Sequence, residues 1–520
     1  MARTRLFAEL RQAMRIAAIA RGRAAAPIDE LADPAFMSVG RANVPRRGVL
    51  GGAFGAGVAA VLPTHALARS AARIAVVGGG IAGLVAAHRL VRGGARDVTV
   101  YESNTRIGGR MLTGRDVLGA GSLVELGGSF INSDHDDMLA LCREFELVLE
   151  DGKAGNEGAL IASYFIDGAH RSLAEIAGAA GDLVRHLADL RKETGDEAEA
   201  RHDQVTAAAL LDQAGVSGWL RKLLDIGLTQ EMGLEPDRMT ALYLIEAFAP
   251  DPANPKLGLF SSDQRFQISG GNDRLPAAIA AKLGSRIRMG DRLEAVRRNG
   301  QAYALTFNRG GVARDVVADI VILTLALTVL RHVRLDLALS PLTKRAIRET
   351  SYGTNAKLFA GVSARPWRTQ GRSGECINDL GFQTVWEDHA RSGNGAGSLT
   401  IFAGGRTGVD FARGAPIERA RRVTAALEGA FPGAAAAFTG RASRMHWPSN
   451  PYVHGSYSCF APRQMTEFDE AFEPVDRVFF AGEHVSEHFS GYMNGGAESG
   501  RLAAESVAKL LARGVLPRLG

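Results

Sequence analysis

The sequence is poor in cysteine and contains no long apolar run. Cys142, Cys376 and Cys459 are too few and too scattered for a disulfide framework or a cysteine-rich metal site, so we expect ordinary core or loop thiols and no metal. No stretch of about 20 apolar residues occurs, which argues against a transmembrane helix and a stable membrane anchor.

Net charge is also absent from most of the chain. Residues 1–68 contain nine arginines and four acids, and this excess accounts for the whole formal charge of +5. The rest of the 520-residue chain is formally neutral, so no nucleic-acid partner is indicated. With 46% hydrophobic residues, it is long enough to form two domains with their own cores.

The first 68 residues have the plan of an export signal. Arg46 and Arg47 precede a short, weakly apolar stretch rich in glycine and alanine, and residues 66–68 (Ala-Leu-Ala) offer a cleavage site. This plan resembles a bacterial twin-arginine signal, which predicts the export machinery as a partner and a periplasmic or secreted location. A mitochondrial presequence (residues 3–25 are rich in arginine) and a disordered tail remain alternatives.

A dinucleotide-binding unit follows the signal. An apolar run over Ile74–Val77 predicts a strand, which meets the pattern G-x-G-x-x-G at Gly78, Gly80 and Gly83. We expect Gly78 to permit a tight turn, Gly80 to let a pyrophosphate approach the backbone, and Gly83 to let the next helix pack closely.

The remainder of this unit concerns the two ends of the cofactor. Ile81 and Ala82 open the predicted helix, whose N-terminus would face the phosphate charge. A second strand ends on Glu102, followed by Ser103, where a carboxylate can accept hydrogen bonds from both ribose hydroxyls. The same negative charge disfavours the 2′-phosphate of NADP.

The predicted elements imply a discontinuous α/β protein. Residues 136–261 have mainly helical periodicity, and residues 331–445 have strand-like runs between glycine-rich turns. We expect these two stretches to form an α+β substrate-binding domain. The Rossmann-type cofactor domain would then combine three other stretches, 69–135, 262–330 and 446–520.

Several motifs in a fixed order resemble the flavin-dependent amine oxidase family, which includes monoamine, polyamine and L-amino-acid oxidases. The resemblance runs from Arg73 to about Ala508 and implies the amine-oxidase fold with FAD as cofactor. The matching segments are the βαβ unit, R-x-G-G-R at 106–110, E-L-G-G-S-F-I at 125–131, the turn at 270–276, Y-G through the lysine at 352–357, G-S-Y at 455–457, F-A-G-E at 480–483 and G-Y-M-N-G at 491–495.

The resemblance also implies contacts to FAD. Arg110 would meet the pyrophosphate, the backbone of Val296 the adenine, and Glu483 the ribityl and diphosphate portion; for Glu483, capping of backbone N–H groups is an alternative or additional role. The final helix, from about Gly495, would stabilise negative charge on the flavin through its N-terminus. Further implied contacts are Gly109, Gly127, Gly128, Ser129, Gly482 and Met493.

Three residues carry the chemistry that the resemblance implies. Lys357 would hydrogen-bond a water near flavin N5 and favour electron transfer to oxygen, whereas the alternative is a solvated lysine on a strand edge. Tyr457 and Tyr492 would form a slot that aligns an amine with N5, whereas the alternative is two core tyrosines.

Two departures from the family pattern shape the prediction. Ser456 occupies the place where animal monoamine oxidases carry the cysteine joined to FAD, so we predict non-covalent FAD. Phe130 occupies the place of an arginine that clamps the substrate carboxylate in many L-amino-acid oxidases, which favours an amine. Arg265 or Arg365 could still supply that clamp from another element.

Polyamine substrates would require acids in the channel. Glu231, Glu235 and Asp237 lie in a helical segment that could line it, although clustered acids are more often solvated surface.

The sequence therefore predicts an FAD-dependent amine oxidase. A neutral primary or secondary amine would lose hydride to flavin N5 and give an imine, while O2 is reduced to H2O2. An L-amino-acid oxidase, an exported dehydrogenase with another electron acceptor, a desaturase-like flavoprotein and a non-enzymatic FAD-binding protein are the alternatives. The oligomeric state is left open, with a homodimer among the choices.

Overall fold

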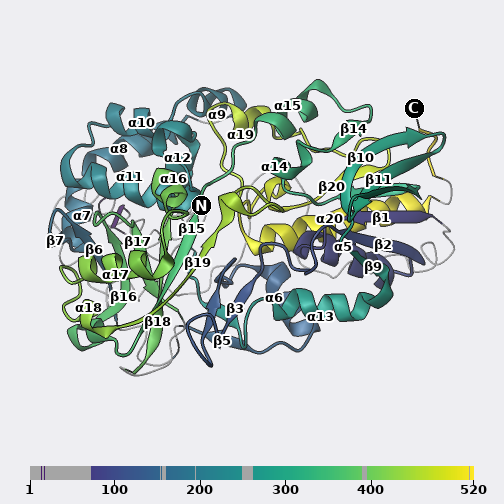
Figure 1. Cartoon of the computed structure of the whole chain (residues 1–520). Helices are drawn as coiled ribbons and strands as arrows, with labels where there is room; N and C mark the ends of the chain where they lie inside the picture. The colour runs from purple at the N-terminus through teal and green to yellow at the C-terminus, as the bar shows by residue number, and fades with distance from the viewer. Residues whose placement is uncertain are drawn as a thin grey trace.

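The computed structural model describes residues 13, 14, 17, 72–152, 154, 160–193, 195–248, 262–388, 395–513 and 516–519. The predicted twin-arginine pair at Arg46 and Arg47 and the predicted cleavage site at 66–68 lie outside the described residues. Figure 1 shows two lobes, one around a parallel sheet and one around a larger sheet with short helices on its outside.

The parallel-sheet lobe is assembled from distant stretches of chain. Its five strands have the order β20-β13-β1-β2-β9, and every neighbouring pair is parallel. Apolar strands such as β1 are buried on both faces because helices cover the sheet. The strand bounds are β1 Arg73–Val77, β2 Asp97–Glu102, β9 Ile287–Met289, β13 Ile320–Leu323 and β20 Val478–Phe480.

Two helices from opposite ends of the chain pack closely on this sheet (Figure 1). α5 spans Ile81–Arg92 and α20 spans Met493–Ala512. A Cβ at Gly500 would lie 2.2 Å from the carbonyl oxygen of Ala82, so only glycine lets α20 approach α5 this closely. This contact fixes the end of the chain beside the glycine-rich turn.

A second, four-stranded sheet packs on the parallel sheet through a shared apolar cluster that contains Val77 and Phe307. Its order is β12-β11-β10-β14. The strand β12 has an exposed and mostly polar sequence that gave no strand prediction. The bounds are β10 Arg292–Asn299, β11 Ala302–Arg309, β12 Val312–Ala318 and β14 Arg334–Asp336.

The seven-strand lobe contains strands that the sequence did not predict. Its order is β19-β15-β18-β17-β16-β6-β7. β6 and β7 come from the stretch expected to be mostly helical, and β6 pairs with β16 more than 200 residues later, a partner that local periodicity cannot reveal. The bounds are β6 Ile161–Ile166, β7 Ala169–His170, β15 Ala356–Val362, β16 Arg372–Asn378, β17 Thr384–Glu387, β18 Gly397–Ala403 and β19 Phe438–His446.

Short helices cover this lobe. The expected helix over 174–190 is divided at Ala180, and a capping box between Ser172 and Glu175 begins its first part. Ala13, Met14 and Ala17 are buried in the same apolar cluster as these helices. The bounds are α7 Leu173–Ala179, α8 Gly181–Leu190, α9 Asp196–Asp203, α10 Ala207–Gln213, α11 Gly218–Met232, η2 Pro236–Arg238, α12 Leu242–Phe248, η4 Pro366–Gln370, α16 Gly405–Asp410, α17 Pro416–Leu427 and α18 Ala434–Ala437.

The remaining elements connect the two lobes or lie at their edges. They are β3 Thr113–Arg115, β4 Leu123–Glu125, α6 Asp136–Glu144, β5 Leu149–Asp151, β8 Phe266–Ile268, α13 Arg274–Leu283, η3 Gly284–Arg286, α14 Leu327–Leu330, α15 Pro341–Glu349, η5 Trp447–Ser449, α19 Gln464–Glu467 and η6 Glu483–Val485. Cys142, Cys376 and Cys459 are free and buried. Within the described part of the chain, no helix has the length and apolarity needed to span a bilayer, and no cluster of metal-ligating side chains occurs.

Candidate functional site

One continuous cavity runs from the glycine-rich turn to the face of the seven-stranded sheet. Gly78 has a φ of +115° and donates its N–H to the carbonyl of Tyr101, so the chain turns sharply after β1. A Cβ at Gly83 would lie 2.0 Å from the carbonyl oxygen of Gly78, whereas a Cβ at Gly80 would meet nothing within 4 Å. Gly80 therefore opens toward the cavity, which Ile81 and Ala82 at the start of α5 also line.

The carboxylate of Glu102 is fixed at the cavity wall by backbone amides. Oε2 accepts a hydrogen bond of 2.7 Å from the N–H of Gly79, and Oε1 accepts one of 2.7 Å from Asn104. Ser103 lines the cavity beside it. This arrangement holds a negative charge where the sequence predicted contacts to ribose hydroxyls.

The R-x-G-G-R segment lies directly against the glycine-rich turn. Gly108 donates its N–H to the carbonyl of Gly79 at 2.8 Å, and Gly109 lies close enough that its Cβ would be 3.3 Å from the Cα of Gly80. Arg106 donates to the carbonyl of Gly109 at 2.9 Å. Bulkier residues at 108 and 109 would separate the two segments and narrow the cavity.

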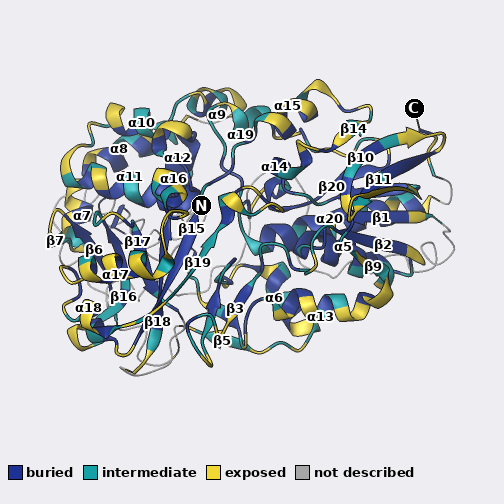
Figure 2. Cartoon of the chain, in the orientation of Figure 1, coloured by how far each residue is buried: buried dark blue, intermediate teal, exposed yellow. Residues whose placement is uncertain are grey.

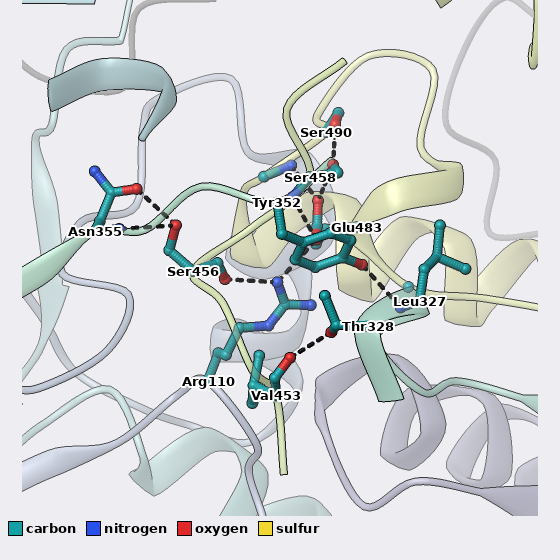
Figure 3. A network of polar contacts seen from close by, with 12 residues as sticks. Arg110, Leu327, Thr328, Tyr352, Asn355, Val453, Ser456, Ser458, Glu483 and Ser490 are labelled. Atoms are coloured by element: carbon teal, nitrogen blue, oxygen red, sulfur yellow. Dashed lines mark hydrogen bonds and ion pairs between the residues drawn. The ribbon is translucent and has the colours of Figure 1, made fainter. Parts of the chain in front are cut away.

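A buried acid links Arg110 to the last part of the chain (Figure 3). Arg110 Nη1 donates to Glu483 Oε1 at 2.8 Å and to the carbonyl of Ser456 at 2.9 Å. Glu483 also accepts hydrogen bonds from the N–H and Oγ of Ser458 and from the N–H of Gly491. It therefore caps backbone N–H groups, as one interpretation of the sequence expected.

The electrostatics of Glu483 follow from these contacts. Burial opposes ionisation, but the charge of Arg110 and the hydrogen bonds outweigh it and lower the pKa of Glu483 to about 2. The ion pair keeps Arg110 at the cavity wall with its side chain 27% exposed.

Lys357 lies in the interior of the seven-stranded sheet. It is 5% exposed and belongs to β15, which pairs with β18 on one side and β19 on the other. The alternative of a solvated lysine on a strand edge is therefore wrong. Burial lowers the pKa of Lys357 to about 8, against the opposing charges of Asp388 and Glu125.

The ammonium group of Lys357 contacts one short segment of chain. Its Nζ donates to the carbonyl of Glu125 at 2.9 Å, to the carbonyl of Gly127 at 2.6 Å and to Ser129 Oγ at 2.6 Å. Ser129, Gly127 and Gly128 line the cavity. A Cβ at Gly128 would lie 2.7 Å from the side chain of Met493, so this segment also contacts the start of α20.

Aromatic residues form the rest of the cavity wall. Tyr457 donates its hydroxyl to the carbonyl of Glu231 at 2.7 Å, and the Tyr492 ring lies 5.0 Å from the His135 ring at an angle of 71°. Both tyrosines line the cavity.

A second group of rings adjoins Lys357. Trp386 lies 6.2 Å from Phe130 and 5.5 Å from Phe402, measured between ring centroids, and all three line the cavity. Lys357 pairs in register with Phe402, and Thr384 on β17 pairs with the same residue. Because side chains alternate along strands, Lys357, Phe402 and Trp386 share one face of the sheet.

The cavity brings together most of the predicted site residues. Gly83 and Val296 are the predicted residues outside its lining: Gly83 packs against Gly78, and Val296 is buried in β10 between β11 and β14. Lining residues that the sequence did not single out include Asn132, Ser262, Gln264, Thr324, Asn355, Trp386, Phe402 and Trp447. Most of them carry no local motif, and only strand register or loop packing places them here.

The two candidate carboxylate clamps do not line the cavity. Arg265 pairs with Asp151 at 2.8 Å on the surface, and Arg365 contacts Glu387 at 3.6 Å in the interior. Among the described lining residues the basic side chains are Arg106, Arg110 and Lys357.

The candidate acids for a polyamine channel also lie elsewhere. Glu235 accepts a hydrogen bond from the N–H of Arg406, Asp237 is exposed, and the side chain of Glu231 is not part of the cavity wall. The acids among the described lining residues are Glu102 and Glu483. Both belong to the half of the cavity beside the glycine-rich turn.

These residues fit a dinucleotide cofactor with a redox-active ring. The open face of Gly80, the N-terminus of α5 and Arg110 provide donors for two phosphates, and Glu102 provides an acceptor for ribose. At the other end, Ser456 Oγ donates to Asn355 Oδ1 at 2.6 Å, and no cysteine lies among the described lining residues.

Comparison with known proteins agrees with this geometry. The family described as flavin containing amine oxidoreductase matches residues 81–508. The putative flavin-containing monoamine oxidase AofH of Mycobacterium tuberculosis is 28% identical over 435 residues, covering 80% of this chain and 92% of that protein. L-amino-acid oxidase BmooLAAO-I of Bothrops moojeni is 24% identical over 434 residues, covering 79% and 84%. The structure of cyclohexylamine oxidase from Brevibacterium oxydans matches with a TM-score of 0.73 at 23% identity and covers 84% of this chain and 99% of that one.

Proposed function

The chain belongs to the flavin-containing amine oxidoreductase family, and from this premise we propose that it is an FAD-dependent oxidase of primary or secondary amines. It has the α/β amine-oxidase fold, with the parallel sheet in the flavin-binding domain. The proposed substrate is an amine with an apolar substituent, and the products are an imine and H2O2.

One observation carries this choice of substrate. The cavity beyond Lys357 is walled by aromatic rings, including Phe130 and Trp386, and no described arginine or acid lines that end. Apolar walls favour an apolar amine because they offer neither an arginine fork for a carboxylate nor a carboxylate for a second ammonium. The name of the relative AofH, a putative monoamine oxidase, supports the same choice.

The proposed mechanism assigns a task to each part of the site. Glu102 and Arg110 hold the ribose and pyrophosphate, with Glu483 keeping the guanidinium in place. Tyr457 and Tyr492 bound the space in which the amine is oriented. The bound flavin supplies the two-electron acceptor for the α-hydrogen of the amine. Lys357 places a buried positive charge that stabilises negative charge developing on oxygen.

The amine must be neutral when it reacts, because an ammonium has no lone pair to stabilise the developing imine. We therefore expect kcat/KM to rise with pH until the amine is deprotonated. Ser456 supports non-covalent FAD, because a hydroxyl cannot form the thioether that a cysteine would.

A peroxide-release assay on the purified yellow protein tests the proposal. The panel pairs L-amino acids with their decarboxylated amines and adds putrescine as a diamine. Turnover of apolar amines, with little turnover of the matching amino acids, is expected. Turnover of amino acids alone would favour the L-amino-acid oxidase, and flavin reduction under nitrogen without peroxide in air would favour a dehydrogenase.

We also propose export by the twin-arginine pathway, which carries folded proteins and therefore suits an enzyme that binds its cofactor first. Cleavage after Ala68 would remove Ala13, Met14 and Ala17, which pack in the full-length chain against the helices of the seven-strand lobe. N-terminal sequencing of protein from the periplasm and the cytoplasm tests this. An intact N-terminus found only in the cytoplasm would contradict export. Size-exclusion chromatography of the mature protein would detect a homodimer.

A further inference from the structure

The ammonium group of Lys357 has three hydrogens, and the structure supplies three oxygen acceptors for them. Two are the carbonyl oxygens of Glu125 and Gly127, and the third is Ser129 Oγ. The sequence predicted that this lysine would hold a water directly. In the structure its hydrogen-bonding capacity is already matched by protein atoms, so its charge reaches the cavity through a neighbour.

Ser129 is that neighbour. A serine hydroxyl has one hydrogen and two lone pairs. Because charged Lys357 donates to Ser129 Oγ, the hydroxyl hydrogen must be directed away from the lysine. The backbone cannot follow such a change, since the carbonyl of Ser129 accepts a hydrogen bond of 2.9 Å from Asn272 Nδ2. The hydroxyl can therefore reorient only by rotation, and Ser129 lines the cavity.

We propose that Ser129 is a positioning residue that transmits the charge state of Lys357 to the flavin-binding cavity. With Lys357 charged, the Ser129 hydroxyl donates into the cavity. With Lys357 neutral, one Nζ lone pair becomes available, and the hydroxyl rotates to donate to Nζ. Ser129 Oγ then presents a lone pair to the cavity instead of a hydrogen. This inference rests on the proposed flavin-dependent function.

The charged groups around Lys357 place this change in an accessible pH range. Burial raises the pKa of Glu125 to about 7 and that of Asp388 to about 6, while it lowers that of Lys357 to about 8. Glu125 comes from β4 and Asp388 follows β17; the neutral Trp386 ring, 5.8 Å from Nζ, adjoins the lysine on the same sheet face. Because these charges interact, their protons are released in shared steps.

The functional consequence has a definite direction. In the charged state the cavity gains a hydrogen-bond donor for negative charge that develops on oxygen or on the reduced cofactor. In the neutral state that donor is lost. Alkaline pH, which favours the neutral amine, therefore removes assistance at the second half of the reaction.

The test is a pH titration of the absorption spectrum of the oxidised holoenzyme between pH 6 and 10 without substrate. A flavin spectral change with a midpoint near pH 8 is expected for the wild type, and Lys357→Met should abolish it. Ser129→Thr retains a hydroxyl and should retain the change. Ser129→Val has nearly the same shape without the hydroxyl and should lose at least half of its amplitude.

Ser262→Ala is the matched control. Ser262 also lines the cavity, but its hydroxyl donates to Asn132 Oδ1 at 3.0 Å, so this variant should titrate like the wild type. Equal titrations of Ser129→Val and the wild type would overturn the proposal, as would a wild-type titration that survives in Lys357→Met. Because no substrate is used, failure of amine turnover would contradict the proposed function without changing this result.

Discussion

Replacing Glu483 with glutamine should destabilise the protein by about 3 kcal/mol at neutral pH. Glu483 is 5% exposed, and its carboxylate accepts hydrogen bonds from Arg110, Ser458 and Gly491. Glutamine would leave the Arg110 charge without its partner and would direct an amide N–H toward another donor. Loss of one member of a buried ion pair costs about 3–5 kcal/mol, and the partial exposure of Arg110 favours the lower end.

The pKa of Glu483 gives the same magnitude. A fall from 4.5 to about 2 on folding corresponds to about 3 kcal/mol. Because the folded-state pKa is the lower one, this stabilisation is fully present above the unfolded value of 4.5. It is lost as the pH falls from 4.5 through about 2, since the carboxylate is then protonated in both states. The difference between wild type and Glu483→Gln should shrink over that window.

Thermal unfolding of the holoenzyme measures this effect. For 520 residues, 1 kcal/mol shifts Tm by about 1 °C, so we expect a decrease of about 3 °C at pH 7 and a smaller one near pH 3. Glu193→Gln is the control, because its ion pair with Arg201 is about half exposed and should contribute no measurable change in Tm. Equal decreases in both variants, or a difference that grows in acid, would refute the reasoning.

Three further predictions concern the cofactor and the substrate. Gly83→Ala should lower the flavin-to-protein absorbance ratio of the purified enzyme at least twofold, because its Cβ would lie 2.0 Å from the carbonyl oxygen of Gly78; an unchanged ratio would contradict the close packing. Acid precipitation of the wild type should release all FAD into the supernatant, since Ser456 cannot form a thioether; a yellow pellet would show a covalent bond elsewhere. Phe130→Arg should raise kcat/KM for L-amino acids relative to their amines about tenfold or more, because it adds a guanidinium to the aromatic wall; an unchanged ratio in the peroxide assay would show that residue 130 does not contact that part of the substrate.

The parts of the site that sequence could predict are those written in short, continuous motifs. The strand before Gly78, the helix after it and the position of Glu102 at the end of β2 are all present as expected. Their geometry depends on backbone conformation and on contacts within one βαβ unit, so a local pattern is sufficient. The family and the amine-oxidase fold were confirmed because several such motifs occur in order.

Other features were invisible because they depend on pairing across the chain. β6 was missed because its partner β16 lies more than 200 residues later. Trp386 and Phe402 carry no motif, and strand register alone places them on the same face as Lys357. Arg265 and Arg365 remained candidate clamps until their partners, Asp151 and Glu387, were known.

The sequence by itself determined that this chain binds a dinucleotide through a glycine-rich turn and belongs among flavin-dependent amine oxidoreductases. Those properties follow from backbone freedom, helix termini and charges at fixed spacing. Only the tertiary structure decided which acceptors surround Lys357 and which walls bound the cavity beyond it. The physical reason is that burial and hydrogen-bond partners, which set the charge of Lys357 and the orientation of the Ser129 hydroxyl, come from strands far apart in the chain.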